Sequence, residues 1–161
     1  MSAVTAEAGW ALLTSKLLIE TKACVDCIIL NKADGTVWSS SSENFQCKAY
    51  VGDVMQEDGS EVKENIDEEK GLLEFAATFK KPKAGIRIAG SKFQLLRAFE
   101  KGTSEDGMPT MFLKKSKGGG CMCVTERAIV IGIWDEGAGQ QASTCNDAVE
   151  KLSRYLKSLK F

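Results

Sequence analysis

The sequence contains no histidine, which removes the side chain that serves most often as a general base and as a metal ligand. It has only two prolines, so the chain supplies no proline-rich tract of its own. No apolar run approaches the roughly 18 residues that span a bilayer, and the N-terminus MSAVTAEAGW lacks a basic segment followed by an apolar core. A net charge of −1 provides no overall field for nucleic acid. These absences weigh against an enzyme and predict a cytoplasmic protein without a nucleic-acid partner.

The length and composition are those of an ordinary globular domain. A chain of 161 residues can bury roughly two-thirds of its unfolded surface in one core, so disulfide staples are not required. Six cysteines without a secretion signal favour reduced thiols in a reducing compartment. We therefore expect a single domain over residues 1–161.

Two segments near the ends of the chain show the periodicity of amphipathic helices. The stripe within residues 5–18 consists of Trp10, Leu13, Leu17 and Leu18. The stripe within residues 143–161 consists of Cys145, Ala148, Val149, Leu152, Leu156 and Leu159. Thr144 and Asp147 resemble a capping box at the start of the second helix.

The middle of the chain holds an acidic segment followed by a third helical pattern. Residues 53–64, DVMQEDGSEVKE, are polar and lack apolar periodicity, which predicts a solvated loop or insertion outside the core. Asn65 is then the candidate N-cap of a short helix, because Asp67, Glu68 and Glu69 follow where the helix dipole favours negative charge.

The remaining segments have the pattern of short antiparallel strands. Turns are predicted at Asp34-Gly35, Gly90 and Glu126-Arg127, each between β-branched or apolar runs. Residues 107–115 add a further strand, which brings the total to about seven. The order of helices and strands predicts an α+β domain, in which helices cover a central antiparallel sheet.

Cysteine pairs raise the alternatives of redox and metal chemistry. Cys24 and Cys27 have the spacing of a redox pair, but residues three apart in a strand point to opposite faces, about 10 Å apart, beyond the roughly 7 Å that a disulfide tolerates. Cys121 and Cys123 share a strand face, yet a zinc site would need two further ligands. Buried neutral thiols are favoured over a metal or redox function.

The glycine run Gly118–Gly120 follows lysines and leads into a strand, whereas a phosphate-binding loop of the Walker type places its lysine after the glycines and before a helix. We expect these glycines to form a tight connection between two strands, using positive φ. The acidic cluster of residues 53–64 has no apolar setting that would raise a carboxyl pKa. No catalytic residue, metal ligand or cofactor site is predicted.

Taken in order, several strings resemble the profilin family of actin-monomer-binding proteins over nearly the whole chain. They are AGWALLTSKLL, DGTVWSSS, IRIAGSKFQLLR, KKSKGGG, AIVIGIWDE and CNDAVEKLSRYL. The resemblance implies that the N- and C-terminal helices lie side by side on one face of the sheet, with a short helix on the other. Residues 1–8 and the acidic insertion of about 53–64 have no counterpart in the usual short profilins.

The resemblance implies a groove for proline-rich peptides, formed by aromatic residues from both ends of the chain. Flat rings stack on the pyrrolidine rings of a polyproline II helix, which loses little entropy on binding. The matching positions are Trp10, Leu13, Trp38, Tyr155 and Phe161, with Leu13 where a tyrosine is common. The residues alone would allow Trp10 and Trp38 to be core residues instead.

The resemblance also implies an actin-binding face, a set of basic residues around an apolar patch, which suits an acidic partner. The matching positions are Lys92, Leu95, Leu96, Arg97, Lys114, Lys115, Lys117, Asn146 and Lys151. Asp147 stands where animal profilins commonly carry a basic residue. A further implied ligand is anionic phosphoinositide. Its candidate residues are Lys114, Lys115, Lys117, Arg154 and Lys157.

The implied function is a non-enzymatic regulator of actin polymerisation in the cytoplasm and its cytoskeleton. It would bind monomeric actin, deliver it to barbed ends and to proline-rich partners such as formin-type factors, and promote nucleotide exchange on actin by favouring one actin conformation. The alternative is a profilin-fold interaction module with weak or altered actin binding that acts through proline-rich or other protein ligands. Asp147, Leu13 and the acidic insertion motivate that alternative.

Overall fold

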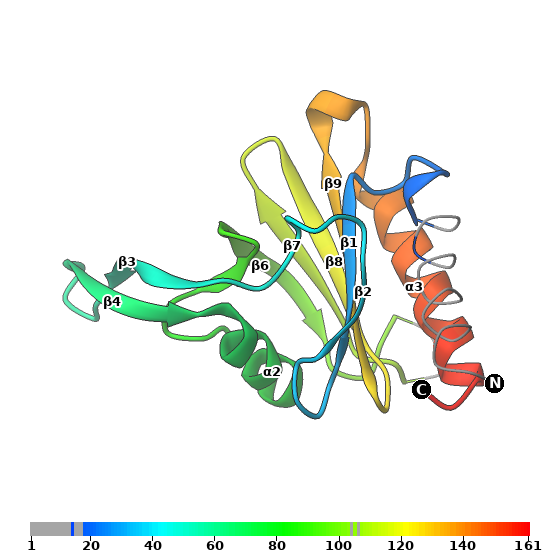
Figure 1. Ribbon diagram of the computed structural model, residues 1–161, viewed down its shortest axis with the longest axis horizontal. Helices are drawn as coiled ribbons and strands as arrows, with labels where there is room; N and C mark the ends of the chain where they lie inside the picture. The colour runs from blue at the N-terminus through cyan, green and yellow to red at the C-terminus, as the bar shows by residue number, and fades with distance from the viewer. Residues whose placement is uncertain (1–13, 15–17, 104, 106) are drawn as a thin grey trace.

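A computed structural model describes residues 14, 18–103, 105 and 107–161. Its centre is a curled antiparallel sheet of seven strands in the order β2-β1-β9-β8-β7-β6-β5 (Figure 1). These strands are β1 (Asp26–Asn31), β2 (Val37–Ser40), β5 (Ile86–Ile88), β6 (Ser91–Phe99), β7 (Thr110–Lys115), β8 (Gly118–Val124) and β9 (Ala128–Asp135). The predicted sheet and its three turns are confirmed, because turn chemistry and β-branched runs are local signals that the fold retains.

Helices cover the two faces of the sheet. One face packs under α3 (Ala142–Ser158), whose buried side includes Cys145, Val149, Leu152 and Leu156. The other face packs against α2 (Glu68–Thr78) through Leu72, Phe75 and Ala76. A short 3₁₀ turn, η2 (Glu136–Ala138), leads from β9 towards α3. The predicted N-terminal helix of residues 5–18 lies largely outside the described residues, so its packing beside α3 stays a prediction.

The helix starts differ from the predicted ones. Asp67, not Asn65, caps α2: its side chain accepts a hydrogen bond from Lys70 N at 3.1 Å, whereas Asn65 lies in a strand. The capping box at Thr144 is wrong, since α3 begins at Ala142, two residues earlier, after Gln141. The apolar stripe of α3 also ends at Leu156, because Leu159 follows the helix and is 48% exposed.

The acidic segment is a β-hairpin and not a solvated loop. It forms β3 (Ala49–Met55) and β4 (Glu61–Asp67), which project from the sheet (Figure 1). Unlike charges and valines meet across the strands: Asp53 pairs with Lys63 and Val54 with Val62. Gly59, at φ 87°, supplies the turn. The loop prediction failed because the pairing partner that organises each strand lies about ten residues away along the chain.

The glycine run lies inside β8 and not in the connection before it. The turn is made by Ser116 and Lys117, and Lys117 itself adopts φ 56°. A Cβ on Gly119 would lie 2.4 Å from the Leu113 carbonyl oxygen and 2.9 Å from Trp134 Nε1. The glycines are therefore required by close packing of the neighbouring strand and of the Trp134 ring, not by positive φ.

Glu68 fixes the base of the hairpin to the rest of the fold. Its carboxylate is only 2% exposed and accepts hydrogen bonds from Lys48 N at 2.8 Å, Tyr50 Oη at 2.9 Å and Gly90 N at 2.8 Å. These donors come from the start of β3 and from the β5–β6 turn. A buried carboxylate is tolerated because each oxygen is hydrogen-bonded and lies at a helix N-terminus.

We expect Glu68→Gln to lower the free energy of unfolding by about 2 kcal/mol, because the amide places a donor where the protein already presents donors. Urea denaturation of the variant and of the wild type would measure the difference. The control is Glu69→Gln, which changes the same charge at the exposed next residue. Equal stability of the two variants would contradict the role given to Glu68.

Candidate binding surfaces

On one face of the sheet, α3 packs mainly against β8 and β9, and among the described residues no helix packs to a similar extent over β6 and β7. Phe112 pairs with Arg97 on β6 and with Cys121 on β8, and Cys121 lies buried beneath α3. Lys114 of β7 likewise pairs with Gln94 of β6. Because directly paired residues share a sheet face, these side chains occupy the uncovered part of the face that carries α3.

Rings and cations alternate on this open face. The Arg97 guanidinium lies 5.0 Å from the centroid of Phe99, and Phe99 meets Phe112 edge-on with centroids 5.3 Å apart. The Lys114 Nζ lies 5.0 Å from the Trp134 ring. Such cation–π contacts hold the charges over apolar surface. We call this set the basic–aromatic surface; it consists of Gln94, Arg97, Phe99, Phe112 and Lys114, with the buried ring of Trp134 beneath Lys114.

Several residues of the predicted actin face belong to this surface or border it. Lys92 is exposed on the same face of β6 as Gln94, two residues away. Leu96 is 58% exposed at the β-bulge between Leu95 and Arg97, where the register with β7 shifts. The bulge turns an apolar side chain outward beside Arg97, so an apolar group lies next to a charge.

Other predicted residues lie on the opposite side. Lys115 is directed to the α2 face, where its Nζ lies 5.2 Å from the ring of Phe93. Leu95 pairs with Leu113 and packs against the same core. Lys117 is exposed in the β7–β8 turn. The predicted actin-binding residues were expected to share one face of the sheet. This expectation is wrong for Lys115 and Leu95, since neighbouring residues of a strand point to opposite faces.

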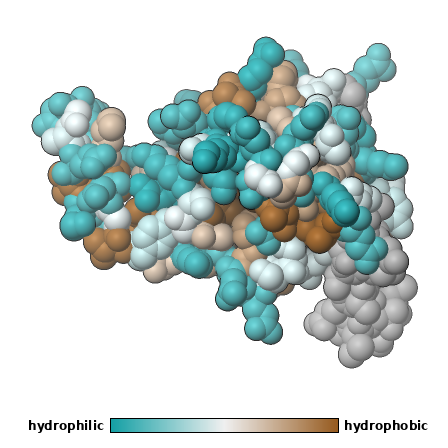
Figure 2. Space-filling model, turned by 90° about the horizontal axis from the view of Figure 1, so that it is seen from above, coloured by the Kyte–Doolittle hydropathy of each residue, from teal (hydrophilic) through white to brown (hydrophobic). Residues whose placement is uncertain are grey.

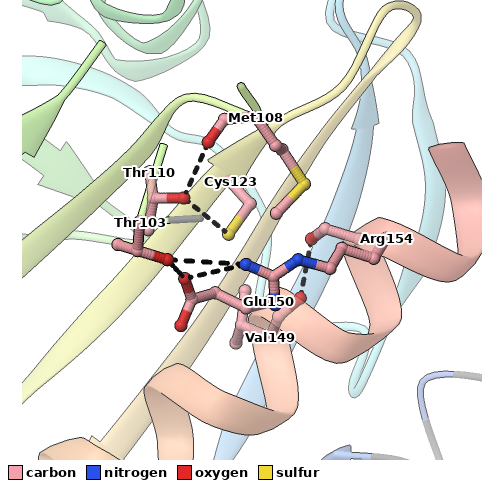
Figure 3. A network of polar contacts seen from close by, with 8 residues as sticks. Thr103, Met108, Thr110, Cys123, Val149, Glu150 and Arg154 are labelled. Atoms are coloured by element: carbon pink, nitrogen blue, oxygen red, sulfur yellow. Dashed lines mark hydrogen bonds and ion pairs between the residues drawn. The ribbon is translucent and has the colours of Figure 1, made fainter. Parts of the chain in front are cut away.

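The edge of α3 that borders β7 carries a polar network (Figure 3). Thr103, from the β6–β7 loop, donates a short hydrogen bond to Glu150, and Arg154 lies 3.5 Å from the same carboxylate. Glu150 is only 7% exposed, so this pairing compensates a nearly buried charge. The network fixes the loop against the helix and engages Arg154, one of the phosphoinositide candidates.

Asn146 lies one turn before Glu150 and therefore on the same edge of α3. Its Oδ1 and the Trp134 Nε1 are buried side-chain atoms without a hydrogen-bond partner among the described residues. Lys151, in contrast, is exposed and directed about 100° around the helix from Glu150. Only Asn146 of these two predicted residues thus lies against the sheet side of α3.

The predicted peptide groove is described in part. Trp38 of β2 meets Phe161 edge-on, with ring centroids 6.0 Å apart and planes at 80°. The Arg127 guanidinium lies 5.7 Å from the Phe161 ring. Tyr155 of α3 is 47% exposed. Trp38 and Phe161 come from distant parts of the chain, as a composite groove requires; we call them the aromatic pair.

The N-terminal contribution to this groove is mostly outside the described residues. Trp10 and Leu13 are among the residues that the structure does not describe, so their assignment stays a prediction. Thr14 Oγ1 lies 2.9 Å from Ser39 Oγ, the residue after Trp38. This hydrogen bond places Thr14 next to β2, beside the residue that follows Trp38.

Some residues of these surfaces were missed in the sequence. Phe99, Phe112 and Trp134 were assigned to strands and given no binding role. Phe99 and Phe112 each lie two residues along their strand from a charged member of the same surface. Trp134 pairs instead with Gly119 on β8. Residues two apart in a strand share a face, so the spacing of Arg97 with Phe99 and of Phe112 with Lys114 was a signal for these two phenylalanines. Nothing local indicated that the described helices leave Phe99 and Phe112 partly exposed.

All six cysteines are free and five are buried, as predicted. Cys24 precedes β1, so the strand geometry expected for Cys24 and Cys27 does not apply, and Cys24 Sγ instead lies 3.4 Å from Cys145 Sγ. The hydrogen bond with Cys145 and burial raise the pKa of Cys24, and burial raises the pKa of Cys27 to about 12. Both thiols are therefore protonated near neutral pH, the form that packs as a small apolar group.

The described part of the chain contains neither a metal-binding cluster nor a helix that could span a membrane. The His, Cys, Asp and Glu side chains described here form no group of three or more that could hold a metal ion. Among the described helices, none is both long and apolar enough to cross a bilayer.

Comparison with known proteins gives a consistent result. A family model described as Profilin matches residues 8–161. A profilin of Tetrahymena pyriformis is 31% identical over 141 residues, which covers 81% of this chain and 84% of the relative. Among solved structures, profilin IB of Acanthamoeba castellanii superposes with a TM-score of 0.67 at 24% identity, covering 94% of this chain and 99% of that one. Mouse profilin IIa, in complex with a double repeat from the FH1 domain of mDia1, superposes with a TM-score of 0.64 at 14% identity, covering 95% and 99%.

Proposed function

The chain belongs to the profilin family, and from this membership we propose that it binds monomeric actin and regulates its polymerisation while also binding proline-rich protein segments. Profilins are non-enzymatic actin-binding proteins, so no bond chemistry is assigned to any residue. We further propose that residues 1–161 form one domain, with residues 1–8 as an extension and the hairpin tip, about residues 53–64, as an insertion.

The basic–aromatic surface is the observation that carries the actin proposal. It combines the exposed Arg97 and the partly exposed Lys114 with rings that are already in contact with them, so binding loses little side-chain entropy. Arg97 and Lys114 supply positive charge for an acidic partner, and Leu96 and Phe112 supply apolar area. We assign Lys92, Leu96, Arg97, Lys114 and Asn146 to this site, and leave Lys115, Leu95 and Lys151 at its margin or outside it.

Binding on this surface would leave the aromatic pair free. One protein could then hold an actin monomer and a proline-rich segment of a nucleation or elongation factor at the same time, which raises the local concentration of actin near that factor. Delivery to barbed ends and faster nucleotide exchange on actin are part of the proposal. Exchange would follow if the protein binds more tightly to the actin conformation that holds nucleotide less firmly.

A sequestration experiment tests the actin proposal. Excess protein is added to pyrene-labelled actin monomers in the absence of free barbed ends, and the critical concentration is measured. We expect the amount of filament to fall as the protein is added. Unchanged filament at every ratio would refute actin-monomer binding and favour the alternative, a profilin-fold module that acts through peptide ligands.

For the peptide site we expect Phe161→Ala to weaken binding of a polyproline peptide about tenfold, because the change removes one ring of the aromatic pair. Intrinsic tryptophan fluorescence with a proline decamer would report the affinity. Phe161 is only partly buried, so the fold should survive truncation of its side chain.

The matched control for this change is Phe79→Ala, a partly buried phenylalanine on the α2 side of the sheet. It should leave the peptide affinity unchanged. Equal peptide affinities for Phe161→Ala and the wild type would place the peptide groove away from the aromatic pair.

The phosphoinositide candidates do not form one cluster. Lys114 and Lys117 lie at the β7–β8 end of the sheet, whereas Lys157 lines a hollow with Lys32 and Met108 at the far end of α3. Arg154 is engaged by Glu150, and Lys115 faces the α2 side. We propose that any anionic headgroup binds at Lys114 and Lys117, where it would compete with actin.

A further inference from the structure

The β3–β4 hairpin is a large feature that neither proposed binding surface uses. It exposes Val51, Met55 and Val62, which are 62%, 58% and 47% exposed. Figure 2 shows apolar surface at this projecting end of the molecule. Apolar side chains gathered on a projecting element indicate a protein interaction surface more than a structural need, because none of the three contributes to the core.

The hairpin is held in place, so it can present these side chains in a fixed position. Arg87 Nη2 donates to the Asp53 carbonyl at 2.9 Å, and Lys83 Nζ donates to Glu64 Oε1 at 3.1 Å. Val54 and Ile66 are buried, and Glu68 binds the base. A preformed surface avoids most of the ordering cost of binding.

A hollow of about 770 Å³ lies between the hairpin tip and β6. Met55 and Glu57 line it from the tip, and Lys92, Gln94 and Leu95 line it from the strand. β5 pairs only with residues 91–93 of β6, so the remainder of β6 forms the edge of the sheet here. A partner can therefore reach the hollow from the side of the basic–aromatic surface.

The hollow is continuous with that surface. Gln94 lines the hollow and also pairs with Lys114, and Lys92 precedes it on the same strand face. A protein bound over Arg97 and Lys114 thus lies next to the hairpin tip. Because the hollow is continuous with the basic–aromatic surface, we expect the same actin monomer to occupy both, and not a separate ligand.

The charges of the hollow are divided between its two sides. The hairpin, residues 49–67, carries six carboxylates and one lysine, and Glu57 is the carboxylate that lines the hollow. Lys81, Lys83 and Lys92 line the other side. A partner that fills the hollow must therefore offer a basic group near Glu57 and an apolar group against Met55, while its acidic groups stay near the lysines.

We propose that the β3–β4 hairpin forms a second contact with the actin monomer bound on the basic–aromatic surface, and that Met55 is the centre of this contact. The inference rests on the proposed actin binding. The hairpin then increases the affinity for actin without taking part in peptide binding, because the aromatic pair lies on β2 and at the end of α3, at the far edge of the sheet order.

The test is Met55→Asp, with Val37→Asp as the matched control. Like Met55, Val37 is an exposed apolar residue on a strand. It lies on β2, at the opposite edge of the sheet. We expect Met55→Asp to weaken actin-monomer binding about tenfold and Val37→Asp to leave it unchanged. Both variants should keep the wild-type affinity for a proline decamer, which also reports that they fold.

Hydrogen exchange gives a second readout that needs no variant. Amides of residues 53–62 in the wild-type protein should exchange more slowly when actin is added, and those of β2 should not. If the wild type binds actin but Met55→Asp binds equally well and the hairpin gains no protection, the hairpin contact is overturned while the proposed function stands. If the wild type does not bind actin at all, both are overturned.

Discussion

Replacing Gly119 by alanine is expected to lower the free energy of unfolding by about 3 kcal/mol, the largest effect of any single methyl group that we anticipate here. The added Cβ would lie 2.4 Å from the Leu113 carbonyl oxygen and 2.9 Å from Trp134 Nε1. A backbone carbonyl of the neighbouring strand cannot move away without disturbing the β7–β8 ladder. Urea denaturation, followed by circular dichroism, would measure the loss.

The control is Gly71→Ala, which adds the same methyl group in the interior of α2. The nearest atom to that Cβ is Pro82 Cγ at 3.8 Å, an ordinary contact. Alanine is the better helix former, so this variant should gain about 1 kcal/mol. The two substitutions should therefore change stability in opposite directions. A stable Gly119→Ala variant would show that β8 tolerates a side chain where the structure leaves no room.

Replacing Lys114 by glutamate is expected to weaken actin-monomer binding more than tenfold at low salt, whereas Lys115→Glu should change it little. Lys114 lies over Trp134 on the open face, and Lys115 lies over Phe93 on the α2 face. Both changes reverse one charge and remove one cation–π contact. Only the first places a negative charge where an acidic partner would dock.

Fluorescence titration of labelled actin monomers at two salt concentrations would measure both variants. The deficit of Lys114→Glu should shrink at high salt, because exposed charges are screened over roughly 10 Å at 0.1 M. Equal losses for the two variants would mean that long-range charge, and not the face of β7, determines the effect. Unchanged affinity for Lys114→Glu would place the actin site elsewhere.

Much of the fold could be predicted because its signals are local. The Asp34-Gly35 turn, the split at Gly90 and the stripe from Cys145 to Leu156 are each encoded within a few residues. The β3–β4 hairpin could not be recognised in this way. Its valines lie within a mostly charged segment, and strand structure there depends on pairing between residues 51–55 and 61–65.

The candidate sites were predicted less completely. Family resemblance indicated Lys92, Arg97, Lys114, Trp38 and Phe161, and the structure brings the first three to one face and the last two into contact. The resemblance could not show that Lys114 and Lys115 lie on different faces of the sheet. Their faces follow from the register of β7, but which face stays open follows from where α3 and α2 pack.

The sequence by itself determined the order of the elements, most of the turns, the predominantly apolar sheet and the absence of a histidine-based site, because propensity, periodicity and composition act over short range. Only the tertiary structure decided that Glu68 is a buried anchor, that the glycines of β8 make room for Trp134, and that the acidic hairpin lies beside β6. These outcomes depend on contacts between residues far apart in the chain, and such contacts exist only once the chain has folded.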